Sequence, residues 1–196
     1  FSIVGCTMKE KEKKMYTLLL LLIYLAFISL GLPDSLLGSA WPVMHKAFQV
    51  PLSYAGLVTM IISGGTICSS LMSERLTKKF GTQIVTVFSV MLTAIALFGF
   101  STASAFWMLC LWAIPYGLGA GAIDAALNNY VALHYNSRHM SWLHCFWGLG
   151  TIISPYVMSY ALTTSVWQNG YRMVSFIQIG IALILFVTLP IWKVNK

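Results

Sequence analysis

Charged side chains are scarce in this sequence. They make up 9% of its 196 residues, whereas a soluble domain usually carries about 25%. Two long segments, 80–123 and 139–171, contain no Asp, Glu, Lys or Arg. A soluble protein of this length would need charge on such surfaces, so the composition excludes an ordinary soluble domain. Because 58% of the residues are hydrophobic, the sequence predicts a membrane protein.

Patterns typical of metal sites and disulfides are also lacking. The four cysteines, Cys6, Cys68, Cys110 and Cys145, show no paired spacing. Small apolar side chains of this kind commonly fill gaps between helices. We therefore expect no metal, no cofactor and no enzymatic activity.

Six stretches are long and apolar enough to cross a bilayer, which takes about 20 residues. They are Tyr16–Met44, Tyr54–Met72, Gln83–Phe100, Phe106–Leu133, Met140–Thr164 and Tyr171–Trp192. Short connections separate them, at Lys46–Ser53, Ser73–Thr82, Ser101–Ala105, Tyr135–His139 and Ser165–Gly170. The last connection contains Asn169-Gly170, a dipeptide typical of turns. The sequence thus predicts an all-α membrane protein with six transmembrane helices in one bundle.

The rest of the chain is short. Residues 1–15 are predicted to form a cytoplasmic tail, residues 16–192 the bundle, and residues 193–196 the start of a cytoplasmic linker. Met8 opens a basic segment that resembles a natural start, so we interpret residues 1–7 as not native. The apolar run that follows is too long for a signal peptide and is interpreted as the first span.

Basic residues are distributed unevenly between the connections. With the N-terminus in the cytoplasm, ten of the 12 Lys and Arg residues fall on the inner side, and only Lys46 and Arg172 fall outside. This positive-inside bias predicts a multi-pass protein of the plasma membrane with both termini cytoplasmic. The net charge of +7 therefore indicates topology and no nucleic-acid partner. An alternative interpretation of the run Lys9–Lys14 is an anchor for anionic lipids.

Two carboxylates stand alone inside apolar sequence. Asp34 lies in Gly-Leu-Pro-Asp-Ser-Leu-Leu, and Asp124 lies ninety positions later in Gly-Ala-Ile-Asp-Ala-Ala-Leu. A carboxylate at bilayer depth costs roughly 3 kcal/mol on insertion scales, so it indicates function. Matching acids in two halves of a bundle predict a 3+3 inverted repeat with a transport pathway between the repeats. The alternative is a chance similarity between segments rich in Gly and Leu.

The fourth span combines polar and small residues at helical spacing. Tyr116, Asp124 and Asn128 recur at multiples of four and share one face. Gly117 and Gly121 are also four apart, which permits close helix packing. The carboxylate and the amide offer several hydrogen-bond positions to a hydroxylated ligand. For Asn128, a hydrogen bond between helices is the alternative.

The connection between the second and third spans contains a second motif. It comprises Ser70, Glu74, Arg75, Lys78 and Lys79, and it resembles the loop signature of the major facilitator superfamily. Ser70 and Glu74 replace the usual glycine and aspartate of that signature. We expect Glu74 to pair with Arg75 or with the positive end of a neighbouring helix and so to act as a cytoplasmic gate. The alternative is a plain positive-inside loop.

The fourth-span pattern, together with the lone acid of the first span, resembles that of the fucose permease branch of this superfamily. Members of that branch are sugar–proton symporters. The resemblance implies that this chain is the N-terminal half of a twelve-helix fold. It also implies a small polar solute, a sugar, as substrate, and coupling to protons, with sodium as the alternative ion. The expected partners are the lipid bilayer and a missing C-terminal six-helix half or a second copy.

The resemblance and the physical argument together suggest a mechanism. The functional carboxylates of that branch map onto Asp34 and Asp124. Since apolar surroundings disfavour a charged carboxylate, both can exchange protons, Asp34 as carrier and Asp124 as a site shared with the substrate. Substrate hydroxyls would bind Asp124 and Asn128. The aromatic side chains expected to cover the sugar are Trp41, Tyr116 and Trp147.

His144 in the fifth span is a further candidate. Histidine titrates near neutral pH and could relay protons, and a purely structural hydrogen bond is the alternative. Two rivals from other classes remain. An intramembrane aspartyl protease uses two span carboxylates, but its acids lie on neighbouring spans. The other rival is a six-helix membrane subunit or binding protein that transports nothing.

Overall fold

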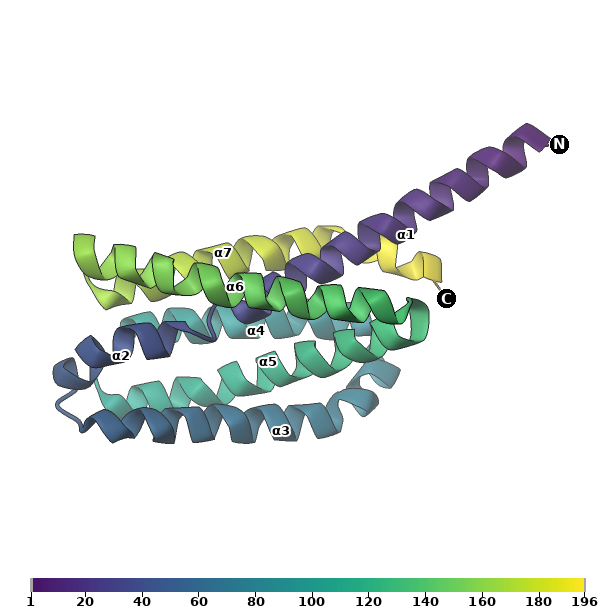
Figure 1. The fold of residues 1–196 in the computed structure, drawn as a ribbon. Coiled ribbons are helices and arrows are strands. Elements are labelled where there is room, and N and C mark those ends of the chain that lie inside the picture. The colour runs from purple at the N-terminus through teal and green to yellow at the C-terminus, as the bar shows by residue number, and fades with distance from the viewer. Residues whose placement is uncertain (1, 196) are drawn as a thin grey trace.

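The chain folds as a bundle of helices. A computed structural model describes residues 2–195, and every regular element in this range is helical (Figure 1). The elements are α1 (Ser2–Gly31), α2 (Leu36–Ala47), η1 (Leu52–Tyr54), α3 (Ala55–Phe80), α4 (Thr82–Thr102), α5 (Phe106–His134), α6 (Ser137–Thr164), α7 (Trp167–Val187) and η2 (Leu189–Asn195). Together α1 and α2 make the first of six candidate membrane spans. The predicted all-α class and six spans are confirmed.

The first span is broken in its middle. Helix α1 ends at Gly31 and α2 begins at Leu36, because Pro33 has no backbone N–H and its ring clashes with the preceding turn. Asp34 lies in this break. At its other end α1 already begins at Ser2, so most of the predicted tail is helical and extends beyond the other helices (Figure 1).

Two predicted connections are wrong. The segment 73–82 is not a loop, since α3 continues to Phe80 and only Gly81, with φ 90°, separates it from α4. The Asn169-Gly170 dipeptide is not a turn but lies within α7. A Cβ on Gly170 would approach Met158 Sδ to 2.7 Å, so this glycine serves helix packing. Likewise only Tyr135 and Asn136 separate α5 from α6.

Glycines set two close helix crossings. Helix α1 meets α6 where Gly31 and Gly150 face each other, and a Cβ on Gly150 would lie 2.6 Å from Ile28 O. Helix α5 meets α3 in the same way, since a Cβ on Gly121 would lie 2.6 Å from Thr66 O. Gly31 and Gly121 each precede an aspartate by three residues. The two aspartates therefore follow equivalent crossings, as an inverted repeat requires.

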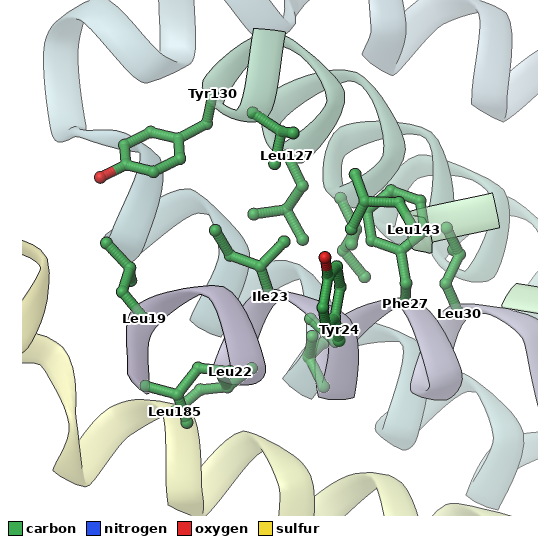
Figure 2. Packing of buried hydrophobic residues seen from close by; sticks show 14 of the residues in the cluster. Leu19, Leu22, Ile23, Tyr24, Phe27, Leu30, Leu127, Tyr130, Leu143 and Leu185 are labelled. Carbon is green, nitrogen blue, oxygen red and sulfur yellow. The ribbon is translucent and has the colours of Figure 1, made fainter. Parts of the chain in front are cut away.

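Two apolar clusters lie on opposite sides of the carboxylates along the length of the bundle. We call the end of the bundle with Lys78, Lys79 and Arg138 the basic end, and the opposite end the far end. The cluster toward the basic end packs α1 against α5, α6 and α7, as Figure 2 shows with Leu19, Ile23, Phe27, Leu127, Leu143 and Leu185. The far-end cluster includes Leu36, Trp41, Met44, Leu97, Tyr116 and Tyr171. Apolar packing on both sides leaves the polar groups at the middle of the bundle.

The crossing of α1 and α6 predicts that alanine substitutions at two glycines of α6 differ sharply in their effect on stability. Gly150→Ala should lower the free energy of unfolding by about 2 kcal/mol, because the added methyl overpacks the contact. Gly148→Ala is the matched control, since nothing lies within 4 Å of a Cβ there, and it should leave stability equal or slightly higher. Thermal unfolding of the detergent-solubilised chain measures both. Equal stability of the two variants would contradict the close crossing.

Candidate functional site

Both intramembrane aspartates open onto one cavity. Its volume is about 340 Å³. The first span, α3, α5 and α6 all contribute to its wall, which is lined by Phe27, Leu30, Asp34, Ile62, Thr66, Tyr116, Ala120, Asp124, His144 and Trp147. Carboxylates three spans apart in sequence thus face a common space.

Asp34 is held by two hydrogen-bond donors from different helices. Tyr116 Oη on α5 donates to Oδ1 over 3.0 Å, and Trp147 Nε1 on α6 donates to Oδ2 over 2.9 Å. The crossing at Gly31 and Gly150 brings the backbone of α6 close enough for Trp147 to reach the carboxylate. Both partners donate, so the arrangement suits an ionised carboxylate, which can only accept.

Asp124 has a partner on its own helix. Asn128 Nδ2, one turn along α5, donates to Asp124 Oδ1 over 2.8 Å and to its backbone oxygen over 2.9 Å. Asp124 Oδ2 has no hydrogen-bond partner among the described residues. Asp34 and His144 line the same cavity as Asp124. Asn128 therefore orients Asp124, but it is not among the residues that line the cavity, so its contact with substrate stays a prediction.

His144 lies on the exposed side of the cavity wall. Its ring meets Phe27 edge to face, with 6.4 Å between the ring centroids. The side chain is exposed and lines the same cavity as Asp124.

A second, smaller cavity lies on the far-end side of Asp34. It holds about 190 Å³ and shares Asp34, Ile62 and Tyr116 with the first cavity. Its other walls come from Pro33, Leu37, Val58, Thr59, Leu97, Phe100 and Tyr171. The hydrogen-bonded pair of Asp34 and Tyr116 therefore stands between two spaces within the bundle.

Trp41 lies away from this site. Its Nε1 donates to Leu52 O over 2.7 Å, and its ring lies 6.2 Å from that of Phe106 at the far end. The side chain is buried in the far-end cluster. The sequence pattern could not separate it from Trp147, because tryptophan is common here and is often a packing or interfacial residue.

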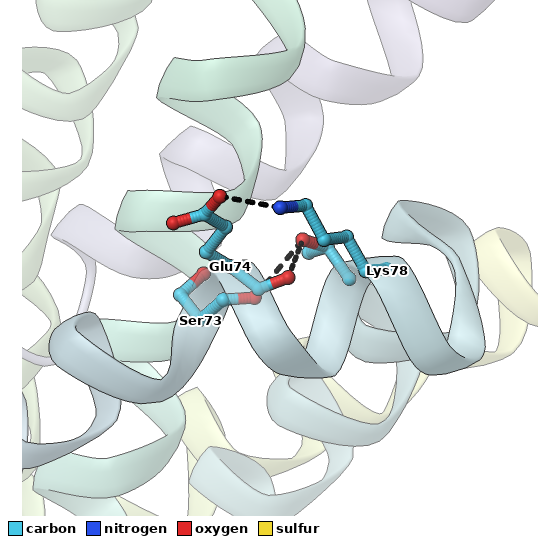
Figure 3. A network of polar contacts seen from close by, with 4 residues as sticks. Ser73, Glu74 and Lys78 are labelled. Atoms are coloured by element: carbon cyan, nitrogen blue, oxygen red, sulfur yellow. Dashed lines mark hydrogen bonds and ion pairs between the residues drawn. The ribbon is translucent and has the colours of Figure 1, made fainter.

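The basic motif at the end of α3 adopts a pairing different from the one expected. Glu74 accepts a hydrogen bond from Lys78 Nζ over 2.7 Å, as Figure 3 shows, and does not pair with Arg75. The reason is helical geometry, since α3 continues through this segment and aligns residues four apart. Ser70 Oγ contacts Gly121 O on α5 at 3.5 Å, and Lys79 lies 5.2 Å over the Phe80 ring.

Thr66 is a cavity residue that the sequence analysis missed. Its hydroxyl oxygen lies 2.9 Å from Ile62 O and 3.3 Å from Gly117 O, and so ties α3 to α5. A signal was available, because Thr66 follows Gly64-Gly65 in an apolar span, where small and hydroxyl residues mark helix contacts. Within residues 2–195, no three His, Cys, Asp or Glu side chains gather as a metal site would need.

The exposure of the Glu74–Lys78 pair predicts a small effect on stability. Both side chains are about three-quarters exposed, so water screens their attraction. Glu74→Gln should shift the thermal midpoint by less than about 2 °C. Gly121→Ala, which forces a methyl against Thr66 and Ser69, serves as a destabilising reference. A drop for Glu74→Gln as large as for the reference would contradict this view of the pair.

Comparison with known proteins agrees with the fold. The family model described as Major Facilitator Superfamily matches residues 23–195. The chain is 23% identical over 163 residues to bypass of stop codon protein 6 of Saccharomyces cerevisiae. The aligned region covers 82% of this chain and 33% of that protein. It is 22% identical over 152 residues to the glucose/mannose transporter GlcP of Bacillus subtilis, covering 76% of this chain and 37% of that protein.

The chain spans about a third of the length of each of these two relatives. The family match covers all six candidate spans in whole or in part and fits the N-terminal six-helix half of the fold. Six apolar helices, two carboxylates facing one cavity, and this match lead to one assignment. The chain is a multi-pass membrane protein that belongs to the Major Facilitator Superfamily, a family of transporters.

Proposed function

We propose that this chain forms the N-terminal half of a secondary transporter that carries a sugar or a similar small polar solute together with protons by alternating access. The observation that supports it most is the cavity of about 340 Å³ shared by Asp34 and Asp124. Its size lies at the lower end of the range for small-molecule sites. Two acids facing one space give a solute and a proton a common place to bind.

The chemistry of the cavity suits a sugar. Carboxylate oxygens accept hydrogen bonds from hydroxyl groups, and Asp124 has an oxygen without a partner among the described residues. Trp147 is 38% exposed and can cover an apolar sugar face. The printed name of one relative, a glucose/mannose transporter, and the resemblance to the fucose permease branch favour the same class of substrate.

Asp34 is the proposed proton carrier, and its partners suggest how protonation acts. Tyr116 can either donate or accept, but the indole N–H of Trp147 can only donate. A proton on Oδ2 would therefore repel Trp147 and loosen the contact between the first span and α6. The donors around Asp34 also favour proton over sodium coupling. A sodium ion would need oxygen ligands at this place, but both carboxylate oxygens of Asp34 already accept hydrogen bonds from Tyr116 and Trp147.

Asp124 is proposed to bind both substrate and proton, with His144 as the relay between this acid and water. Asn128 keeps one carboxylate oxygen oriented, which leaves the other oxygen to take a proton. A protonated oxygen can donate a hydrogen bond to a substrate hydroxyl, so a proton and the substrate can occupy Asp124 together, as symport requires.

A single half would leave the cavity open on one side. Helices α3 and α6 present exposed apolar residues, among them Met60, Leu71, Ile152 and Tyr156. We propose that a second six-helix half, or a second copy of this chain, covers the side of the cavity that these helices flank. The proposed location is the plasma membrane with both termini cytoplasmic, on the basis of the positive-inside bias, and the proposed cytoplasmic gate lies at Ser70, Glu74, Arg75, Lys78 and Lys79.

Other functions have less support. A protease would need two acids free to share a proton around a water molecule, whereas Tyr116 and Trp147 occupy both oxygens of Asp34. A subunit that only binds would have the same cavity without transport. Vesicle assays with the chain alone and with a second six-helix half separate a binding subunit from a transporter.

The division of roles between the acids gives the main test. Asp34→Asn should abolish sugar accumulation driven by a proton gradient but leave sugar binding nearly unchanged. Asp124→Asn should weaken sugar binding itself by about tenfold, because an acceptor of charge-assisted hydrogen bonds is lost. Accumulation is measured in proteoliposomes that also hold a second six-helix half, and binding is measured by calorimetry.

Glu12→Gln is the matched control for these variants. It makes the same carboxylate-to-amide change on an exposed part of α1 and should behave as wild type. Proton-driven accumulation at the wild-type level in Asp34→Asn would remove Asp34 from the mechanism. Unchanged affinity in Asp124→Asn would remove Asp124 from the sugar site.

Trp147 provides an independent prediction. Trp147→Phe keeps an aromatic face but removes the N–H donor to Asp34. Sugar binding should fall by no more than about fivefold, while the pH dependence of accumulation should shift because Asp34 loses a partner. Trp107→Phe, at an exposed position on α5, is the control. An unaltered pH profile in Trp147→Phe would show that this hydrogen bond plays no part in coupling.

A further inference from the structure

A lone amide lies at the centre of the most apolar stretch of α7. Gln178 stands between Ile177 and Ile179, and none of its side chain is exposed. Burying an amide is costly unless its polar atoms are paired. The amide nitrogen donates to the backbone oxygen of Ser29 on α1, and the amide oxygen accepts from Thr93 Oγ1 on α4 over 2.7 Å. One side chain thus joins three helices.

The backbone oxygen of Ser29 needs a hydrogen-bond donor from outside α1, and the sequence shows why. In an α-helix this oxygen would accept from the N–H four residues later. That residue is Pro33, which has no N–H. Gln178 therefore supplies from α7 the donor that Pro33 withholds from α1, and the buried carbonyl is satisfied although the helix is broken.

Ser29 determines which way the amide points. The two ends of an amide differ, one donating and one accepting. The backbone oxygen of Ser29 can only accept, so it requires the amide nitrogen, and the reversed amide would set two acceptors against each other there. Thr93 fits this orientation because its hydroxyl, which also lies 2.7 Å from Val90 O, can donate to the amide oxygen.

We propose that Gln178 is a positioning residue for Asp34. By holding Ser29, it fixes the end of α1 at the break from which Asp34 is directed to Tyr116 and Trp147. The consequence for transport rests on the proposed function, but the positioning itself does not. Among the described residues, the side-chain hydrogen bonds of Gln178 go to Ser29 and Thr93 and to neither carboxylate.

The second aspartate provides an internal comparison. Asp124 is preceded by Ile123, which has a backbone N–H, and α5 continues without a break. Asp124 therefore needs no donor from another helix to keep its place. A change at Gln178 should affect Asp34 and spare Asp124, which separates positioning from general loosening of the bundle.

The experiment compares the reactivity of the two acids. The chain is embedded in lipid nanodiscs and treated with a hydrophobic carbodiimide, and adduct formation at Asp34 and Asp124 is followed by peptide mass spectrometry. Gln178→Met keeps the length of the side chain and removes both hydrogen bonds. It should change the rate at Asp34 by about fivefold, leave the rate at Asp124 unaltered, and lower the thermal midpoint by about 5 °C.

Ser175→Ala is the matched control. Ser175 is equally buried one turn away on α7 and donates to Ala94 O on α4 over 2.8 Å, but its hydrogen bond does not involve α1. It should lower the thermal midpoint without changing the rate at Asp34. Should Gln178→Met fail to fold, Thr93→Val tests the same point, since it removes the hydroxyl that donates to the amide oxygen and should alter the rate at Asp34 in the same direction.

Restoring the missing N–H completes the test. Pro33→Ala gives Ser29 a donor within α1, so the drop in thermal midpoint caused by Gln178→Met should be smaller in that background. Equal changes of rate at Asp34 and Asp124, or the same drop with and without Pro33, would overturn the proposal. Failure of the proposed function would appear separately, as absence of sugar uptake by the wild-type protein, and would leave these reactivities as they are.

Discussion

A carboxylate inside a membrane-spanning bundle must find its hydrogen-bond donors within the protein, because lipid supplies none. This constraint organises the centre of the molecule. Asp34 takes its donors from Tyr116 and Trp147 on two other helices, so α1, α5 and α6 must approach closely at one level. Glycines at the crossings, such as Gly150, make that approach possible. Close packing and the charged site are therefore two consequences of one requirement.

The two halves of the bundle meet the requirement differently. Asp124 lies on a continuous helix and takes its donor from Asn128 one turn away. Asp34 lies at the break made by Pro33 and takes its donors from other spans. An acid tied across helices is sensitive to how they move against each other, and an acid tied within one helix is not. Such an asymmetry suits a division into a coupling acid and a binding acid.

Some of the site could be predicted because its signals are local. A lone aspartate in an apolar span stands out by its insertion cost, and residues four apart on a helix must share a face. Gln178 follows the same logic as a lone amide, yet its role depends on Ser29 lying beside it in space. The sequence places Trp41 at the cavity wrongly, because an indole ring has no sequence signal that separates packing from binding. It also predicts a turn at Asn169-Gly170 wrongly, because the packing of Gly170 against α6 is a tertiary contact that the dipeptide does not reveal.

The sequence by itself determined that this is a six-span membrane protein with two acids in its middle and an excess of basic residues at alternate ends of its spans. Those properties follow from composition and from spacing along a helix, which do not depend on neighbours. Only the tertiary structure decided that both acids face one cavity, which donors reach Asp34, and that Lys78 is the partner of Glu74. These depend on the rotation and crossing of whole helices, and such geometry is set by many packed contacts at once.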